Sequence, residues 1–402
     1  MITSDIISVI CEFILNIKDT STISKLNKNI YENRNQYSLY DVNYKRINEN
    51  NIYKIKGINC MELNNGIIKC VTEHNYINKI ICERSLNHMD LINLPKNITS
   101  LNITPGEKTF RMIKYKQIIM SAANIKELSI LSKCGEINLE NCINIKKLEI
   151  YIEENTKILL PRILNSSNDF ENIKINDFTI YCHDINYIKN FQYAHLVNAI
   201  YYDNNYKGDI YWNFDTTSKY VKLTKINVSC SAYILNFGID SKNLLELEIL
   251  MKNNVHFIEQ KHIDINLPIN ISKIKLEIKD YSQDVPILIH YIPQNVKHFE
   301  YISNNIPYIR QYAKHNTMKY IKFVGRQVQF KINNIDNLVV ENCAVNLSCY
   351  SNIGNLTVKD CTFCGFYKNI NGKICTNDDL KYLDKLRFHK KYNLKKKFES
   401  IN

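Results

Sequence analysis

Apolar and polar residues alternate in a short pattern that recurs along most of the chain. In "LPKNITSLNI" (residues 94–103), a Pro-x-Asn opening leads into apolar-x-x-apolar-x-apolar. The phrase returns as "LPINISKIKLEI" (267–278) and "IPQNVKHFEYI" (292–302), with Pro three residues before the first apolar position each time. The period of two in its last residues predicts a short strand with one apolar and one polar face.

Fourteen copies of the pattern follow one another between residues 58 and 358. Their middle residues lie 17–27 positions apart, with a mean of about 23, a period typical of stacked repeats. Since 45% of the residues are hydrophobic, the bare pattern also arises by chance, and the full phrase carries more weight. The middle residues are Met61, Ile80, Leu101, Leu128, Leu148, Ile173, Ala199, Ile226, Leu247, Ile274, Phe299, Ile321, Leu338 and Leu356.

The segments that follow three of these copies complete a longer motif. "VKHFEYISNNI" (296–306), "IDNLVVENCAV" (335–345) and "IGNLTVKDCTF" (353–363) match apolar-x-x-Leu-x-Leu-x-x-[Asn/Cys]-x-apolar, the pattern of leucine-rich repeats. We expect Asn304 to turn the chain by bonding backbone groups, and Cys343 and Cys361 to pack as small buried residues.

Stacking is the physical solution for such units, because one short strand cannot bury its apolar face alone. We therefore expect an α/β repeat solenoid, with a curved array of parallel strands over residues 46–370. A helical domain at 1–45 would precede the array, and a basic C-terminal helix at 371–402 would cap it. The concave polar face would bind a target protein through Glu127, Glu149, Glu246, Glu248, Lys273, Lys275, His298, Glu300, Tyr320 and Lys322. Its mixed charges suit a protein partner better than a polyanion.

Residues 3–31 differ from the array, because their apolar residues follow helical spacing. Ile6, Ile7, Ile10, Phe13 and Ile14 form one stripe, and a second helix, capped by Asp19, carries Ile23, Leu26 and Ile30. One interpretation is a helical cap that seals the first repeat.

Two short helices with an Asp between them, ahead of a leucine-rich array, resemble an F-box. The residues at matching places are Ile2, Asp5, Ile6, Ile7, Ile10, Asp19, Ile23, Leu26 and Lys28. Thr3 stands where the family has Pro, and Ile30 where it has Trp. With the "LPxNI" phrases and "NNIP" at 304–307, the chain resembles F-box proteins with leucine-rich or FNIP-type repeats, found in amoebae and giant viruses.

The resemblance implies a substrate receptor of a cullin–RING (SCF-type) ubiquitin ligase, which is not itself an enzyme. Its F-box would dock a Skp-type adaptor, and its repeats would hold the target protein. The adaptor-binding residues would be Ile2, Asp5, Ile6, Ile7, Ile10, Ile14, Ile23 and Leu26. The alternative is a repeat protein that sequesters a partner without any link to a ubiquitin ligase.

Net charge changes this interpretation little. The chain carries +12, but residues 381–397 alone hold +7 of it. Such a Lys-rich tail is typical of a solvated helix face, and contact with nucleic acid or a nuclear import receptor is the less favoured alternative. No apolar run reaches the ~18 residues of a membrane helix. We expect a cytoplasmic protein (host cytoplasm if viral) whose 13 cysteines stay reduced.

Two motifs in the sequence give only weak support for a metal site or a phosphate-binding site. Cys361-x-x-Cys364, with Cys343, Cys349 and Cys375 nearby, is the strongest metal candidate, but the repeat motif already explains Cys343 and Cys361. "TPGEKTF" (104–110) is only a faint phosphate-loop match. No catalytic set stands out, so we expect neither a metal nor a cofactor.

Overall fold

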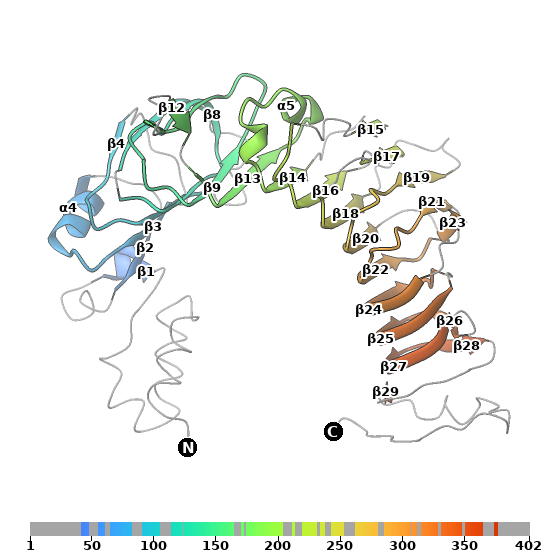
Figure 1. The fold of residues 1–402 in the computed structure, drawn as a ribbon. Helices are drawn as coiled ribbons and strands as arrows, with labels where there is room; N and C mark the ends of the chain where they lie inside the picture. Colours follow the sequence, from blue (N-terminus) through green and yellow to red (C-terminus); the bar gives the residue numbers. More distant parts are fainter. Residues whose placement is uncertain are drawn as a thin grey trace, which may run out of the picture. The chain divides into compact units, whose positions relative to one another are not determined.

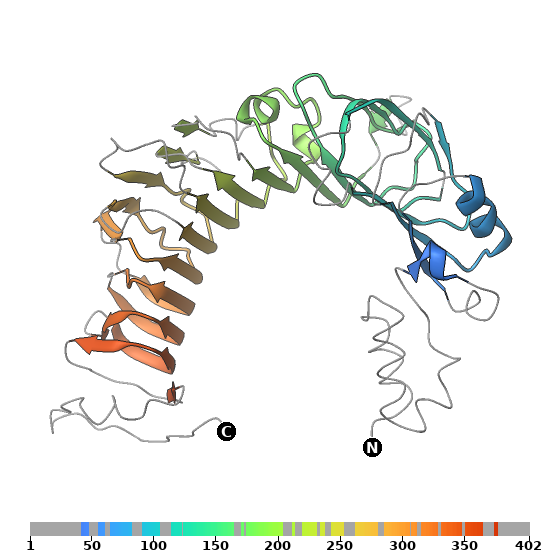
Figure 2. The ribbon, with the colours of Figure 1, turned by 180° about the vertical axis from the view of Figure 1, so that it is seen from behind.

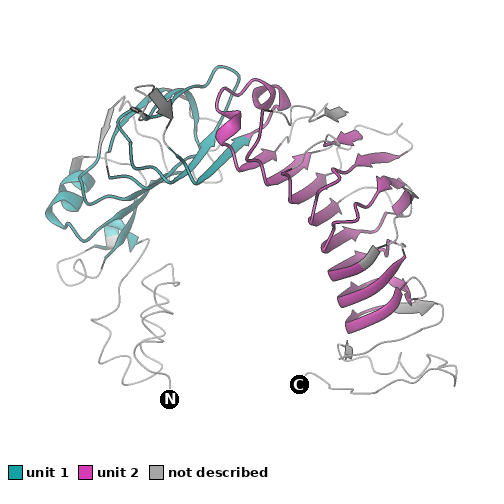
Figure 3. Ribbon diagram, viewed as in Figure 1, with its two compact units in different colours: residues 1–181 teal, residues 182–402 magenta. Residues whose placement is uncertain are grey.

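Parallel strands dominate the computed structural model. They form two compact units, residues 1–181 and residues 182–402, and the boundary lies within the predicted 46–370 array (Figure 3). The predicted adaptor-binding residues and the basic tail after residue 376 lie outside the described residues. The structure describes residues 42–47, 55–60, 65–82, 91–104, 114–122, 124–164, 170–172, 174–203, 211–213, 219–230, 234–237, 243–252, 262–279, 285–305, 307–311, 315–328, 331–347, 350–364 and 374–376.

Unit 1 contains a ladder of short parallel strands (Figure 1). In order, the ladder consists of β1 (Val42–Asn43), β2 (Gly57–Cys60), β3 (Lys79–Cys82), β5 (Ser100–Ile103), β7 (Glu127–Ile130), β9 (Lys147–Tyr151) and β13 (Asp177–Cys182). A second parallel row holds β4 (Leu91–Asn93), β6 (Lys114–Ser121), β8 (Lys133–Asn138) and β10 (Lys157–Leu159). Helix α4 (Asn65–Glu73) joins β2 to β3, and β11 (Arg162–Leu164) pairs antiparallel with β12 (Phe170–Asn172).

Unit 2 repeats this plan with longer strands, which lie side by side in both views (Figures 1 and 2). Its ladder consists of β14 (Ala199–Asp203), β16 (Lys225–Cys230), β18 (Glu246–Lys252), β20 (Lys273–Lys279), β22 (His298–Ser303), β24 (His315–Gly325), β25 (Ile332–Glu341), β27 (Tyr350–Lys359) and β29 (Ile374–Thr376). The second row holds β15 (Tyr211–Asn213), β17 (Ile234–Asn236), β19 (Ile263–Asn266), β21 (Ile287–Tyr291) and β23 (Pro307–Gln311), and β26 (Ala344–Asn346) pairs with β28 (Thr362–Cys364).

The predicted core row is confirmed in both units by the strand register. In unit 1 the aligned middle residues are Ile80, Leu101, Leu128 and Leu148. In unit 2 they are Ile226, Leu247, Ile274, Phe299, Ile321, Leu338 and Leu356. All of these side chains are buried. Stacking thus places one apolar side chain per repeat into a continuous core, as in a repeat solenoid.

Three predicted middle residues were wrong. Ile58 is the register partner of Ile80, the place predicted for Met61. The sequence pattern had assigned Ile58 to the first apolar position of its repeat. Phe178 partners Leu148 in place of Ile173, because the additional strands β11 and β12 lengthen that repeat.

Ile200 partners Ile226 in place of Ala199, a difference of one residue. Because strand side chains alternate between faces, this slip reverses the predicted face of Tyr201, although the small Ala199 is buried as well. Ile200 and Tyr202 are therefore buried, while Tyr201 is half-buried on the polar face.

The second row of strands was not predicted. Alternation in the returning segments accounts for it: Ile263 and Ile265 in β19 and Ile287 and Ile289 in β21 are all buried. Within the described residues, helices are few, namely α4, α5 (Ile185–Lys189) and the short 3-10 turns η2 (Tyr44–Arg46) and η4 (Ala194–Leu196).

The Pro-x-Asn opening forms the turn before a strand. The amide of Ile98 donates to the carbonyl of Pro95 at 3.0 Å, which closes the turn. Asn97 Nδ2 then donates to the carbonyl of Ile77, in the preceding repeat, at 2.7 Å. Asn124 Nδ2 bonds Lys96 O in the same way, at 2.6 Å. In these two repeats the Asn therefore ties the turn to the one before it.

In the last repeats, the chain leaves the strand at a residue with positive φ. Gly325, Asn342 and Asp360, four residues after the register partners Ile321, Leu338 and Leu356, have φ of 83°, 52° and 50°. This left-handed conformation turns the chain off the strand. Cys343 follows as a buried residue, as predicted, whereas Cys361 is only half-buried.

Asn304 does not hold the role predicted for it. Its side chain is exposed, and the neighbouring Asn305 is the buried residue. Asn305 Nδ2 donates to Val285 O at 2.9 Å, and its amide donates to Ser303 Oγ at 3.0 Å. Burial of an amide side chain requires such partners, which the inward position supplies.

Candidate protein-binding face of the strand ladder

The predicted target-binding residues fall into two groups. Glu127 and Glu149 lie in unit 1, on β7 and β9. The other eight lie on four adjacent strands of unit 2, each pair flanking a buried middle residue. They are Glu246 and Glu248 on β18, Lys273 and Lys275 on β20, His298 and Glu300 on β22, and Tyr320 and Lys322 on β24.

The strand register aligns these eight residues in two rows. One row runs Glu246, Lys273, His298, Tyr320, and the other runs Glu248, Lys275, Glu300, Lys322. We call these two rows, together with Lys225 and Asn227 on β16, the charged face. Acidic β18 and basic β20 are direct neighbours, so side chains of opposite charge stand on adjacent strands ~4.8 Å apart.

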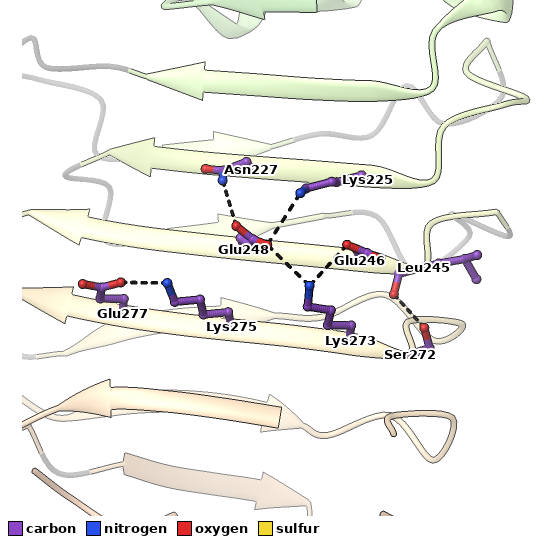
Figure 4. Close-up of polar contacts among 9 residues, drawn as sticks. All are labelled: Lys225, Asn227, Leu245, Glu246, Glu248, Ser272, Lys273, Lys275 and Glu277. Carbon is purple, nitrogen blue, oxygen red and sulfur yellow. Dashed lines mark hydrogen bonds and ion pairs between the residues drawn. The ribbon is translucent and has the colours of Figure 1, made fainter. Parts of the chain in front are cut away.

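Ion pairs join the strands of the charged face (Figure 4). Lys273 Nζ lies 3.5 Å from Glu246 Oε2 and 3.8 Å from Glu248 Oε1. Lys225 Nζ lies 3.6 Å from Glu248 Oε1, and Asn227 Nδ2 donates to Glu248 Oε2 at 3.0 Å. Three strands thus share one polar network, whose side chains are partly exposed and partly held by their neighbours.

Burial and cation contacts compete at the edge of this network. Burial alone raises the pKa of Glu277, but hydrogen bonds from Lys279 and Lys275 outweigh it and hold that pKa below its usual range. The Nζ–Oε distances are 2.7 Å for Lys279 and 3.1 Å for Lys275. Burial lowers the pKa of Lys225, but Glu248 and then Tyr201 raise it more, so its net pKa is raised.

Aromatic side chains extend the charged face at both ends. Lys225 Nζ lies 5.6 Å from the centre of the Tyr201 ring, within cation–π range. The rings of His298 and Tyr320 lie 6.1 Å apart, and burial followed by Glu300 and Glu341 raises the pKa of Tyr320. Aromatic groups therefore flank the charged groups on one surface.

Sequence reasoning missed several members of this surface. Lys225 and Asn227 flank the correctly predicted Ile226, so the same rule that found Glu246 and Glu248 would have found them. Tyr201 was missed because its repeat was placed one residue early. Glu277 and Glu341 lie further along their strands, beyond the predicted strand length.

Within the described ranges, no group of three or more His, Cys, Asp or Glu side chains is placed to hold a metal ion. No helix in the described part of the chain has the length and apolar character needed to cross a membrane. Comparison with family models, curated proteins and solved structures finds no match for this chain.

Proposed function

We propose that the protein is a receptor that binds a target protein on the charged face of unit 2 and delivers it to a cullin–RING ubiquitin ligase. The observation that supports target binding most directly is the alternation of charge from β18 to β24 on one continuous strand surface. Complementary charge patterns of this kind give a protein interface its specificity.

The network that holds these side chains also favours binding. Lys273 and Glu248 each keep partners on neighbouring strands before any target arrives. Side chains that are already ordered lose less conformational entropy on binding. The two rows therefore form a preorganised surface for a partner with the opposite charge pattern.

The ligase half of the proposal depends on residues 2–26 and their resemblance to an F-box. In this function those residues dock a Skp-type adaptor, and the ladder holds the target within reach of the ligase. The rival function is a binding protein that retains its target without a ligase. Both use the charged face, so the N-terminal segment separates them.

Target binding is tested with paired neutral variants of the full chain. Glu300→Gln with Lys322→Gln changes the face by two charges of opposite sign, which leaves the net charge unchanged. Affinity for the captured target should fall by about tenfold or more, since interface charges set specificity. Arg310→Gln on β23, an exposed second-row position, is the control and should bind normally. Equal loss in the control, or no loss in the double variant, contradicts the proposal.

Ligase association is tested by co-expression with a Skp-type adaptor. The wild-type chain should copurify with the adaptor, and Ile6→Asp combined with Ile10→Asp should abolish this association without affecting target binding. A wild-type chain that binds its target but no adaptor supports the sequestering function instead.

A further inference from the structure

Cys343 and Cys361 occupy the same position in neighbouring repeats. Each follows a left-handed residue, and each lies five residues after one of the register partners Leu338 and Leu356. Their local contacts are the same as well. Cys343 Sγ donates to Glu341 O and Cys361 Sγ donates to Lys359 O, both at 3.1 Å. The two thiols therefore stand one above the other on adjacent turns of the ladder.

The two residues are also in contact. The amide of Cys343 donates to Cys361 Sγ at 3.5 Å. A disulfide needs Cα atoms about 4.4–6.8 Å apart, a range that includes the ~4.8 Å spacing of neighbouring strands. Neighbouring turns of the ladder are therefore spaced closely enough for a disulfide between them.

Their surroundings give the two sulfurs different reactivity. Cys343 is buried, and Cys361 is half-buried. Contact with the Cys343 side chain lowers the pKa of the Cys361 thiol, whereas the same contact, followed by burial, raises the pKa of Cys343. Because the thiolate is the reactive form, Cys361 is the better nucleophile, and Cys343 supplies the second sulfur.

We propose that Cys361 and Cys343 form a peroxide-sensitive pair that closes into a disulfide between the two repeats. The Cys361 thiolate attacks hydrogen peroxide, breaks its O–O bond, and becomes a sulfenic acid while hydroxide leaves. The Cys343 sulfur then attacks the sulfenic sulfur, and the S–S bond forms as water is released with the Cys343 proton. Two thiols lose two electrons in total, and one peroxide becomes two waters.

Closure would fasten the C-terminal repeats together. Cys343 follows β25 and Cys361 follows β27, so the new bond links the ends of adjacent strands. In stacked-repeat proteins each repeat contacts only its neighbours, so the repeats near an end depend on few interfaces. A covalent link at this place restrains the repeats nearest the end of the ladder.

Unit 1 supplies an internal comparison. Cys60 and Cys82 are direct register partners, on β2 and β3, but both side chains are buried in the core. Peroxide has no solvent-exposed sulfur to reach there. The inferred reaction depends on exposure as well as on proximity, and the Cys343–Cys361 pair differs from Cys60–Cys82 in having one partly exposed thiol.

The test is disulfide mapping of the full chain. Reduced protein is treated with hydrogen peroxide, its remaining thiols are alkylated, and peptides from a non-reducing digest are identified by mass spectrometry. We expect a peptide linked through Cys343 and Cys361, reversed by dithiothreitol, and formed on the order of tenfold faster than any Cys60–Cys82 link. Over-oxidation of Cys361 with Cys343 still alkylated would overturn the proposal, as would equal rates for both pairs.

Serine variants separate the two steps. Cys343→Ser should leave Cys361 as a sulfenic acid that dimedone traps, whereas Cys361→Ser should leave Cys343 alkylated after peroxide. Cys82→Ser is the matched control and should not alter the Cys343–Cys361 link. If Cys343 oxidises as fast in Cys361→Ser as in the wild type, Cys361 is not the nucleophile. Disulfide mapping uses the wild-type chain, so its result does not depend on whether a variant folds.

Discussion

Unit 2 contains long repeats around β16–β22 and short ones around β24–β27, and the two kinds return the chain differently. In the long repeats, 21–27 residues separate successive middle residues, and strands of 6–7 residues follow a separate turn. In the short repeats the separation is 17 and 18 residues, and strands of 10–11 residues extend back through the region of that turn.

Asparagine links successive turns in both kinds of repeat. In the long repeats it donates to a backbone carbonyl of the preceding turn, as Asn243 Nδ2 does to Val221 O at 2.5 Å. In the short repeats Asn337 Nδ2 donates to Lys319 O in the same way at 3.3 Å, and Asn355 Nδ2 also donates to the side chain of Asn337, at 3.0 Å from Oδ1. The core row is the same in both, since Leu247 and Leu338 are equally buried. Register thus fixes the core, while repeat length fixes only the return path.

The largest expected effect comes from core substitutions, which test whether the long and the short repeats bury their core row equally well. Leu247→Ala and Leu338→Ala should each lower the free energy of unfolding by about 2–5 kcal/mol, because each leaves a cavity at a fully buried site. Denaturant unfolding measures both. Lys275→Ala, on the polar face, is the control and should cost less than about 1 kcal/mol. A much smaller cost at Leu338 would mean that the short repeats pack differently.

The next effect concerns the left-handed strand ends of the short repeats. Gly325→Ala should cost about 2–3 kcal/mol, because its Cβ would meet Asn304 Oδ1 and lie 2.7 Å from Ser303 O at a φ of 83°. Asn342→Gly, at the equivalent position of the next repeat, should be close to neutral. Thermal unfolding of the two variants distinguishes them. Equal destabilisation would show that backbone conformation is not the cause.

The asparagine contacts should differ by a smaller amount. Asn97→Ala leaves the carbonyls of Val71 and Ile77 without this donor, so we expect a cost of about 1–2 kcal/mol. Asn355→Ala removes one exposed contact and should cost about 0.5 kcal/mol. Chemical unfolding measures the free energy lost in each variant and therefore the ratio of the two losses. A larger loss from Asn355 would indicate that the stacked asparagines hold the short repeats together.

The smallest effect is a pH dependence in the long repeats. Because the folded pKa of Glu277 is lowered, its contribution to stability is present above the ordinary pKa of about 4.5 and is lost as pH falls through the folded value. Glu277→Gln should therefore be less stable than the wild type at neutral pH, by less than about 1 kcal/mol after solvent screening, and equal to it at strongly acidic pH. Urea titrations at several pH values measure this, and added salt should reduce the difference. A difference that grows toward acid would contradict the assignment.

The sequence predicted the core row well because burial restricts its positions to apolar residues at fixed register. It failed where two residues compete for the row, as with Ala199 and Ile200, and where an insertion such as β11–β12 shifts the count. The second row of unit 2 was missed because its strands have only three to five residues, too few for a clear period.

The charged face was predictable residue by residue but not as a network. Alternation places Glu248 and Lys273 on the polar side of their strands. That their side chains meet depends on β18 and β20 being neighbours, and the pairing of Glu248 with both Lys225 and Lys273 depends on side-chain reach across two strand gaps. Neither follows from the spacing within one repeat.

Site-specific photo-crosslinking tests target binding on the charged face most directly. A photoreactive amino acid replaces Glu300 on that face or, in a separate variant, Tyr308 on β23, whose side chain is 54% exposed. We expect the position of Glu300 to crosslink the same target that the wild-type chain binds, and the position of Tyr308 to crosslink none of it. Crosslinking from Tyr308 with none from Glu300 would contradict binding on the charged face.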